Sequence, residues 1–192
     1  QRAALAYAIK VPLVYTNVFI RQWTAFQRLG VHAIASPALW HTSVRLDTPV
    51  SLGTYRSSRS PDEPIVLHLS KTPCQPGLEA RAQHRAGRME LLSTPFDTIE
   101  RRIREQLVRL LGGAGFDPAD HILAITVNRW PHGYAYQYNS LSDAFWLEGG
   151  EPPCLVARRR LGRITIANSD AAAYAYTDAA IDQAHRAVHE IL

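Results

Sequence analysis

The carboxy-terminal third of the chain carries the stretch whose residue types and order could support chemistry. Ile164 and Ile166 alternate with polar neighbours, which is typical of a half-buried strand, and Asp170 follows in a tight turn. An apolar helical pattern comes next, which Thr177 can cap. A strand that leads into a capped helix leaves free backbone N–H groups above the turn. The stretch therefore predicts a site for an anionic or electron-rich ligand.

Other reactive residue types stand in less suggestive places. His185 and His189 are four residues apart on the last predicted helix, a spacing that can hold a metal ion. The sequence offers no HEXXH acid and no obvious third ligand, so we expect no metal centre. Ser169 lacks the G-x-S-x-G pattern, which leaves acyl transfer without support. Residues 158–160 are three arginines before a turn, where such a run is usually solvated.

Composition excludes several classes of protein. The 192 residues are 46% hydrophobic, which permits a sizeable core in one domain or in parts of two. The net charge of +4 is modest and scattered, so we expect no nucleic-acid partner. Cys74 and Cys154 do not imply a disulfide framework. No stretch approaches the roughly 20 apolar residues of a transmembrane helix, and Gln1 begins no signal peptide. We expect a soluble protein, with the compartment left open between bacterial periplasm and cytoplasm.

Two helices are predicted with defined apolar faces. Thr94 as cap and Pro95 at the first position start the longest helix, which ends at Gly112 and Gly113. Its apolar residues recur every three or four positions: Phe96, Ile99, Ile103, Leu107 and Leu110. The last helix has the predicted apolar face Ile181, Ala184, Val188 and Ile191. A third, short helix at Trp23, Phe26 and Leu29 ends at Gly30.

Most other segments are predicted as strands. These are residues 13–20, 65–70, 121–130, 154–160 and 163–168, together with short strands within 31–55. Residues 1–10 resemble the tail of a helix that Pro12 ends, and residues 56–64 form a polar surface loop. Many strands with few intervening helices indicate the α+β class rather than a regular βαβ array.

Several of these segments resemble a known family. GRITIANSD and AYTDAAIDQAHRAV are similar to the carboxy-terminal flavin-binding segment of the FAD-dependent amine oxidase superfamily. KVPLVYTNV, WTAFQRLGV, QHRAGRMELLSTPF and ITVNRWPHGYAYQYN resemble its bacterial spermidine dehydrogenase group. That family has a Gly-rich dinucleotide fold at its amino terminus, and no G-x-G-x-x-G follows a strand here. The resemblance therefore covers the last part of such an enzyme, with substrate-domain-like residues 1–125 and a flavin-binding segment at 126–192.

The resemblance implies positions for the cofactor FAD. Asp170 takes the place of the acid near the flavin ribityl and phosphate groups, and the Thr177 backbone faces the flavin pyrimidine ring. Asn168, Ser169 and Tyr176 complete the implied cofactor-binding set. Many members have Gly where this chain has Asn168. On residue type alone, Asp170 could equally be a turn-forming residue.

The resemblance also implies a substrate channel. Trp130 takes the place of an aromatic residue near the flavin, and Tyr134 and Tyr174 could wall the channel. Aromatic faces attract an ammonium group by about 0.5–2 kcal/mol each. His132 could assist proton removal from the amine, because its unperturbed pKa is near neutrality. Aromatic residues on a strand more often belong to the core, and a loop histidine often has no role.

The implied function is that of the carboxy-terminal part, or a subunit, of an FAD-dependent oxidoreductase acting on a polyamine C–N bond. It would need the amino-terminal FAD-binding segment as covalent or separate partner. The sequence contains no haem attachment motif, and haem stays open because some relatives carry it. Two alternatives remain: a flavin oxidoreductase for a non-amine substrate, and a non-catalytic interaction module that keeps the fold.

Overall fold

The computed structural model describes residues 1–141, 143 and 150–192, which divide into two compact units. The first unit combines Gln1–Val11 with His132–Leu192, and the second comprises Pro12–Pro131. We call them the terminal unit and the sheet unit and describe each by itself. The predicted functional division after residue 125 stays a prediction. No helix of the described residues is long and apolar enough to cross a membrane.

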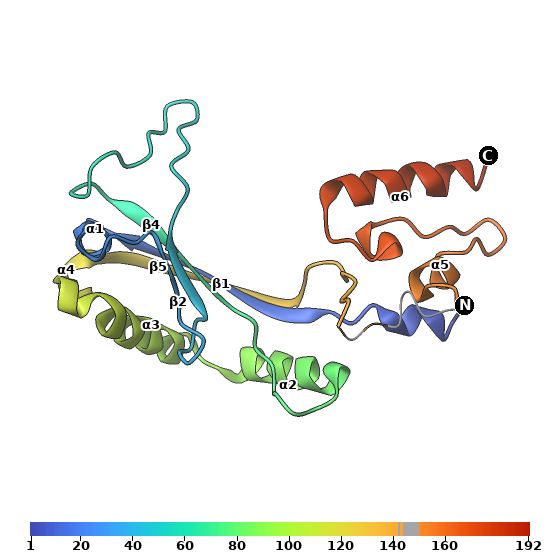
Figure 1. Ribbon diagram of the computed structural model, residues 1–192, viewed down its shortest axis with the longest axis horizontal. Helices are drawn as coiled ribbons and strands as arrows, with labels where there is room; N and C mark the ends of the chain where they lie inside the picture. Colours follow the sequence, from blue (N-terminus) through green and yellow to red (C-terminus); the bar gives the residue numbers. More distant parts are fainter. Residues whose placement is uncertain (142, 144–149) are drawn as a thin grey trace. The chain divides into compact units, whose positions relative to one another are not determined.

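The sheet unit is built on one five-stranded sheet in the order β2-β3-β4-β1-β5 (Figure 1). The strands are β1 (Val11–Ile20), β2 (Ala33–Ala35), β3 (Ser43–Leu46), β4 (Ile65–Lys71) and β5 (Ile122–Gly133). Strand pairs β2–β3, β3–β4 and β1–β4 are antiparallel. The mixed α/β fold with an antiparallel sheet agrees with the predicted α+β class.

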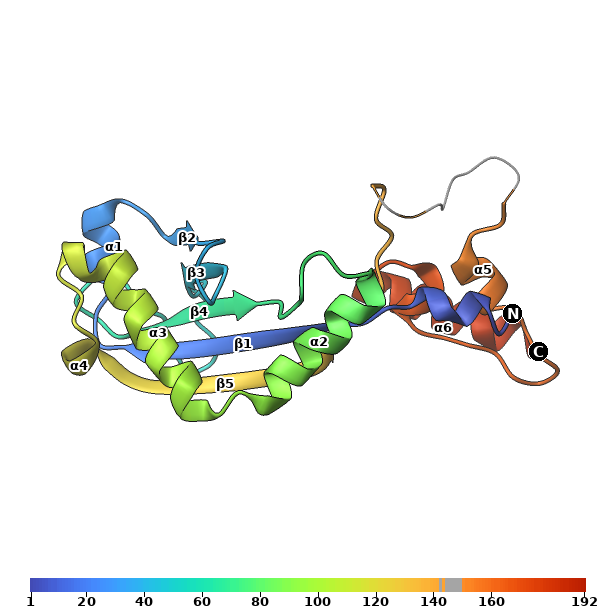
Figure 2. The ribbon, with the colours of Figure 1, turned by 90° about the horizontal axis from the view of Figure 1, so that it is seen from below.

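Helix α3 (Phe96–Leu111) covers one face of this sheet (Figure 2). Ile99, Ile103 and Leu107 are fully buried and form a core with Val18 and Leu67. Each such side chain contributes about 1.5–3 kcal/mol when it leaves water. The alternation of β1 decides which residues join this core, because successive side chains point to opposite faces. The apolar face predicted for α3 is therefore confirmed at these positions, whereas Phe96 is exposed.

Short elements surround this core. Helix α1 (Thr24–Leu29) ends at Gly30, whose φ of 67° is the left-handed cap predicted from the sequence. Helix α4 (Pro118–His121) precedes β5, and the 3-10 turn η2 (Gly112–Ala114) follows α3. Buried Gln106 of α3 accepts a bond from the His41 backbone N–H (2.9 Å) and donates to the His41 carbonyl (2.8 Å). These bonds hold the loop between β2 and β3 against the helix.

The start of the longest helix differs from the prediction. Helix α2 (Ala80–Ser93), which the sequence patterns above do not predict, precedes it, and Thr94 belongs to the end of α2. The Thr94 hydroxyl donates to the Glu90 carbonyl (2.7 Å), so it is not available to cap α3. Pro95 takes the N-cap position of α3 without a side-chain hydrogen bond. The predicted capping role of Thr94 is therefore wrong.

The terminal unit contains η1 (Ala4–Tyr7), α5 (Pro153–Ala157), η3 (Ser169–Ala172) and α6 (Thr177–His189). The predicted helix tail at residues 1–10 is only the single turn η1, and Pro12 lies inside β1. The predicted strand at 154–160 is wrong, because its first residues belong to α5, which Pro153 suits as a first helical residue.

The predicted strand at 163–168 is also wrong. Its only ladder contact is an isolated bridge between Leu161 and Ile164. A strand needs a neighbouring strand for its backbone N–H and C=O groups, and the described residues of the terminal unit provide none beyond that bridge. Ile164 is consequently 65% exposed.

Helix α6 lies where the sequence predicts it, but the predicted buried face is wrong. Ile181 is 64% exposed and Val188 is 56% exposed. Arg158 donates to the side-chain oxygen of Gln183 (3.0 Å), which holds Gln183 inside the unit. Ala179 and Ala187 lie one turn before and one turn after Gln183, and their small side chains let α6 pack closely against the rest of the terminal unit. The buried side of the helix comprises Ala179, Gln183 and Ala187.

Candidate functional site

The acid predicted to lie near the cofactor has an internal partner. Both carboxylate oxygens of Asp170 accept from the Lys10 ammonium, at 2.6 and 2.5 Å, and one also accepts from the Tyr136 backbone N–H at 2.6 Å. The side chains of Lys10 and Asp170 are 27% and 20% exposed. A carboxylate has about four acceptor positions, so a further donor can still bind. Asp170 therefore fastens the amino-terminal segment to its turn and keeps capacity for a ligand hydroxyl.

The backbone around Asp170 takes rarely populated conformations. Asn168 has a φ of 141°, Ala173 a φ of 51° and Tyr134 a φ of 49°, all in the region that glycine favours. Each such residue costs of order 1–3 kcal/mol. The Asn168 side chain compensates in part by accepting from the Ala171 backbone N–H at 3.2 Å as the cap of η3. The surrounding contacts thus hold the turn at Ser169 and Asp170 in one strained shape.

The start of α6 is left without a side-chain cap in the described structure. Tyr176 occupies the N-cap position and makes no capping bond, so the capping role predicted for Thr177 is wrong. Thr177 is the first helical residue instead, since its N–H belongs to the first turn. The exposed rings of Tyr174 and Tyr176 lie 4.7 Å apart beside this helix end. The first turn therefore offers N–H donors to an electron-rich ligand, next to two aromatic faces.

A second tyrosine pair lies deeper in the terminal unit and is structural. The rings of Tyr7 and Tyr136 meet edge to face with centroids 5.2 Å apart, and the Tyr7 hydroxyl donates to the Asp170 carbonyl. Burial, with smaller contributions from Cys154 and Asp170, raises the pKa of Tyr7 to about 12. Burial and the hydrogen bond to Asp143 also raise the pKa of Tyr136. Neither hydroxyl can act as a base near neutral pH.

The sheet unit has a second candidate site on the sheet face opposite α3. Tyr15, Asn17 and Phe19 alternate with the buried residues of β1, so they share this face. The strand register pairs Asn17 with His68 of β4. Trp130 of β5 is half exposed and lies edge-on to Tyr15, with ring centroids 6.1 Å apart. We call Tyr15, Asn17, His68 and Trp130 the aromatic face.

His68 is held in a defined orientation on the aromatic face. Its Nδ1 lies 2.9 Å from Oδ1 of Asn17, and its ring is 4.9 Å from the Tyr15 ring. An amide oxygen only accepts, so this assignment places the histidine proton on Nδ1 and leaves Nε2 as an acceptor. Burial and the nearby Arg45 lower the pKa of His68, against a weaker opposing effect of Asp47. A neutral histidine can therefore accept a hydrogen bond beside two aromatic rings.

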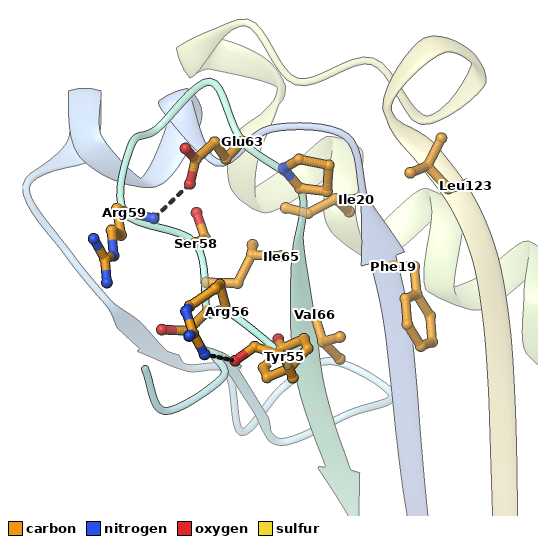
Figure 3. A pocket seen from close by; sticks show the side chains of 12 residues that line it. Phe19, Ile20, Tyr55, Arg56, Ser58, Arg59, Glu63, Ile65, Val66 and Leu123 are labelled. Carbon is orange, nitrogen blue, oxygen red and sulfur yellow. Dashed lines mark hydrogen bonds between the residues drawn. The ribbon is translucent and has the colours of Figure 1, made fainter. Parts of the chain in front are cut away.

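The sheet unit also contains a cavity of about 640 Å³, which lies beside the end of β1 and the start of β4 (Figure 3). Phe19 and Val66 are paired in the register, and together with Leu123 they give the cavity an apolar floor. A loop with Tyr55, Arg56 and Ser58 lies over the strand ends. Arg56 donates to the Gly53 and Tyr55 carbonyls, which keeps its side chain folded onto its own loop. The volume is in the range of small-molecule sites.

The structure separates the predicted site residues into the two units. His132, Tyr134 and Tyr174 belong to the terminal unit with residues 168–177, whereas Trp130 belongs to the sheet unit. Tyr134 accepts through its carbonyl from the Lys10 ammonium at 3.2 Å and so lies close to Asp170. His132 is exposed. The catalytic and substrate-binding roles predicted for these residues stay predictions.

Sequence reasoning missed Lys10 and most of the aromatic face. The alternation in LVYTNVFI was visible, and it places Tyr15 and Asn17 on one face of a strand. Nothing in that pattern shows that this face is uncovered or that His68 lies opposite Asn17. Those facts come from the register with β4 and from the position of α3.

Comparisons with solved structures show a likeness in fold. No family model matches the chain, and no curated protein matches it. Among solved structures, the fold is similar to a double mutant of putrescine oxidase with redesigned cofactor binding, at a TM-score of 0.55 and 14% sequence identity. The match covers 93% of this chain and 34% of that one, so this chain spans about a third of that protein. The chain is therefore similar in fold to part of that putrescine oxidase.

Proposed function

We propose that this chain is part of an FAD-dependent amine oxidoreductase. The observation that carries the proposal is the likeness of 93% of the chain to part of a putrescine oxidase. The aromatic face and the open first turn of α6 support it, because such an enzyme needs a slot for an amine and donors for a flavin. The identity is low, so the resemblance in sequence and the chemistry of these two sites bear the rest of the argument.

The residues of the terminal unit fit one edge of a flavin. The uncapped N–H groups at Thr177 suit the electron-rich pyrimidine edge, and Asp170 has acceptor capacity for a ribityl hydroxyl. Asn168 and Ser169 set the turn between them. When bound, FAD supplies a two-electron acceptor that takes a hydride from the carbon next to the amine nitrogen. The helix N–H groups would stabilise the negative charge that this transfer creates.

The sheet unit would handle the amine. Trp130 and Tyr15 present rings that attract an ammonium group by about 0.5–2 kcal/mol each. His68 Nε2 can accept a hydrogen bond from the N–H of the amine and so orient it, and the neutral form of the amine is the one that can lose hydride. The imine product then takes up water and yields an aldehyde and a shorter amine. We propose a polyamine such as spermidine as the substrate, as in the bacterial group that the sequence resembles.

The proposal includes a partner segment that carries the rest of the FAD site. Two features support it: the chain spans 34% of the similar putrescine oxidase, and residues 163–168 have strand-like alternation without a partner strand in the described structure. The segment could be covalent or a separate chain.

The cavity beside Phe19 favours one alternative. Its apolar floor does not suit a polycation, nor does a lining with two arginines, Arg56 and Arg59, against one acid, Glu63. A flavin oxidoreductase for an apolar, non-amine substrate would use this cavity in place of the aromatic face. Product analysis with polyamines distinguishes the two functions.

A visible spectrum of the natively purified protein, beside a denaturing gel, tests the proposal. We expect flavin bands together with a second chain or a larger precursor. Asp170→Ala should weaken flavin retention on gel filtration, and Asp182→Ala, which removes an exposed acid on α6 of the same unit, should not. A colourless protein that binds no added FAD and brings down no second chain would refute it. If flavin is bound, the activity on spermidine is measured next. Trp130→Leu should raise the KM for spermidine, because it removes an aromatic ring that attracts the ammonium group.

A further inference from the structure

Two histidines on α6 lie outside both candidate sites and face each other. The Nε2 atoms of His185 and His189 are 3.1 Å apart, and their ring centroids are 4.3 Å apart. Both side chains are exposed and occupy positions i and i+4 of the 13-residue helix. The sequence predicts no metal centre here because it shows no third ligand, but from this geometry we infer that the pair binds a divalent transition-metal ion of the Ni²⁺, Cu²⁺ or Zn²⁺ class. The inference does not depend on the proposed function.

The separation of the two nitrogens fits two ligands of one ion. Metal–imidazole bonds in zinc sites measure about 2.0–2.1 Å. Two such nitrogens are about 2.9 Å apart at a 90° angle and about 3.3 Å apart at a tetrahedral angle, by simple trigonometry on that bond length. The observed 3.1 Å lies between these values. The nitrogen separation therefore suits a shared ion, and rotation of the two exposed rings would aim both lone pairs at it without a change of helix backbone.

Without metal, the same geometry allows a hydrogen bond. One Nε2 must then carry a proton and the other must offer its lone pair, so each histidine is restricted to one tautomer. A metal ion instead takes the Nε2 lone pair of both rings, and the histidine that carried its proton on Nε2 then carries it on Nδ1. Imidazole nitrogen is a good ligand for zinc, copper and nickel, and this preference sets the chemical class of the ion.

The surroundings of the pair do not oppose a cation. Arg186 lies next to His185 in the sequence, but its guanidinium donates to Gln183 (2.9 Å), to Glu190 (2.6 Å) and to the Ile166 carbonyl. These bonds neutralise its charge and direct it toward the unit. Asp182 precedes His185 by three residues, which places a carboxylate on the neighbouring helix turn. A second cation, Arg160, donates to the Glu190 carbonyl, so the two arginines are matched by the carboxylates of Glu190 and Asp182.

The two histidines lie on the side of α6 that faces away from the rest of the terminal unit. Residues two positions apart on a helix are separated by about 200°, so His185 and His189 point away from the buried Gln183 and Ala187. Among residues 1–141, 143 and 150–192, no cluster of three or more potential ligands is found. Water must complete the coordination, which gives an exchangeable site rather than a structural one.

Titration of the tag-free chain with NiCl₂, followed by calorimetry at pH 7.5, tests the inference. We expect one ion per chain and a loss of affinity of about tenfold or more in both His185→Ala and His189→Ala. His32→Ala, which removes a single exposed histidine, is the matched control and should bind as the wild type does. Ni²⁺ should also raise the midpoint of thermal unfolding of the wild type but not of the two variants.

Two outcomes would overturn the inference. One is a wild-type affinity equal to that of His185→Ala/His189→Ala. The other is a loss of affinity in His32→Ala as large as in the α6 variants, which would place the ion elsewhere. Circular dichroism of the metal-free variants confirms that α6 is retained, so that a lost site is not a lost helix.

Discussion

The ion pair between Lys10 and Asp170 joins two segments that are 160 residues apart in the sequence, and its removal should loosen the terminal unit. Exposed pairs contribute about 0–1 kcal/mol, whereas breaking a buried pair costs about 3–5 kcal/mol. The two side chains are 27% and 20% exposed, between these limits. After solvent screening we expect a coupling free energy of about 1.5 kcal/mol. For a chain of this length that corresponds to about 3–6 °C in unfolding midpoint.

A double-mutant cycle with Lys10→Met and Asp170→Asn measures this coupling. Asp170→Asn keeps an acceptor for the Tyr136 N–H, so its cost should be similar to that of Lys10→Met. Asp170→Ala leaves that N–H without its acceptor and should cost about 1 kcal/mol more. The assay is thermal unfolding at 50 mM and 500 mM salt, with the coupling weaker at high salt. A coupling below about 0.3 kcal/mol would show that Lys10 and Asp170 do not hold the segments together.

Two further predictions concern the sheet unit. Burial and Lys71 lower the pKa of His41 from 6.5 to about 3, so the folded state excludes a proton that the unfolded chain binds below pH 6.5. Its contribution to stability is complete above pH 6.5 and falls with pH down to about 3; from pH 8 to pH 5 the loss is about 2 kcal/mol. Urea unfolding should show this loss in the wild type but not in His41→Gln, and equal losses would contradict the pKa. Gly87→Ala should destabilise by more than about 1 kcal/mol despite the better helix propensity of alanine, because its Cβ would lie 1.9 Å from the Pro73 carbonyl oxygen. Gly113→Ala, with nothing within 4 Å, is the control in the same denaturation assay, and similar effects in both would refute the steric argument.

The sheet unit was largely predictable because its local signals agree with its packing. Alternation in β1 and the three-to-four spacing in α3 both identify residues that are buried. Gly30 ends α1 through a left-handed φ that its missing Cβ allows. Helix α2 escaped prediction because its interior contains Gly87 and few apolar residues, and its position depends on a close approach to Pro73. The open aromatic face could not be foreseen, since strand register and helix placement are long-range properties.

The terminal unit was predicted less well, and for a different reason. Its apolar periodicity is present in the sequence, but the residues that carry it are not the ones it buries. Helix α5 replaces a predicted strand because Pro152 and Pro153 favour a helix start over a ladder. The turn at Asp170 is likewise held by bonds from Lys10 and the Tyr136 backbone N–H, which no local pattern contains.

The misplaced faces of the terminal unit form one pattern. Ile164, Ile181 and Val188 all carry strand or helix periodicity, and all three are more than half exposed. In the sheet unit the corresponding apolar positions of β1 and α3 are buried. Exposed apolar residues with regular spacing normally pack against something, because leaving each one in water forfeits about 1.5–3 kcal/mol. The spacing of these apolar residues therefore indicates that the terminal unit packs against a further segment. This supports the proposal that a partner segment, which also completes the FAD site, adds a strand beside residues 163–168.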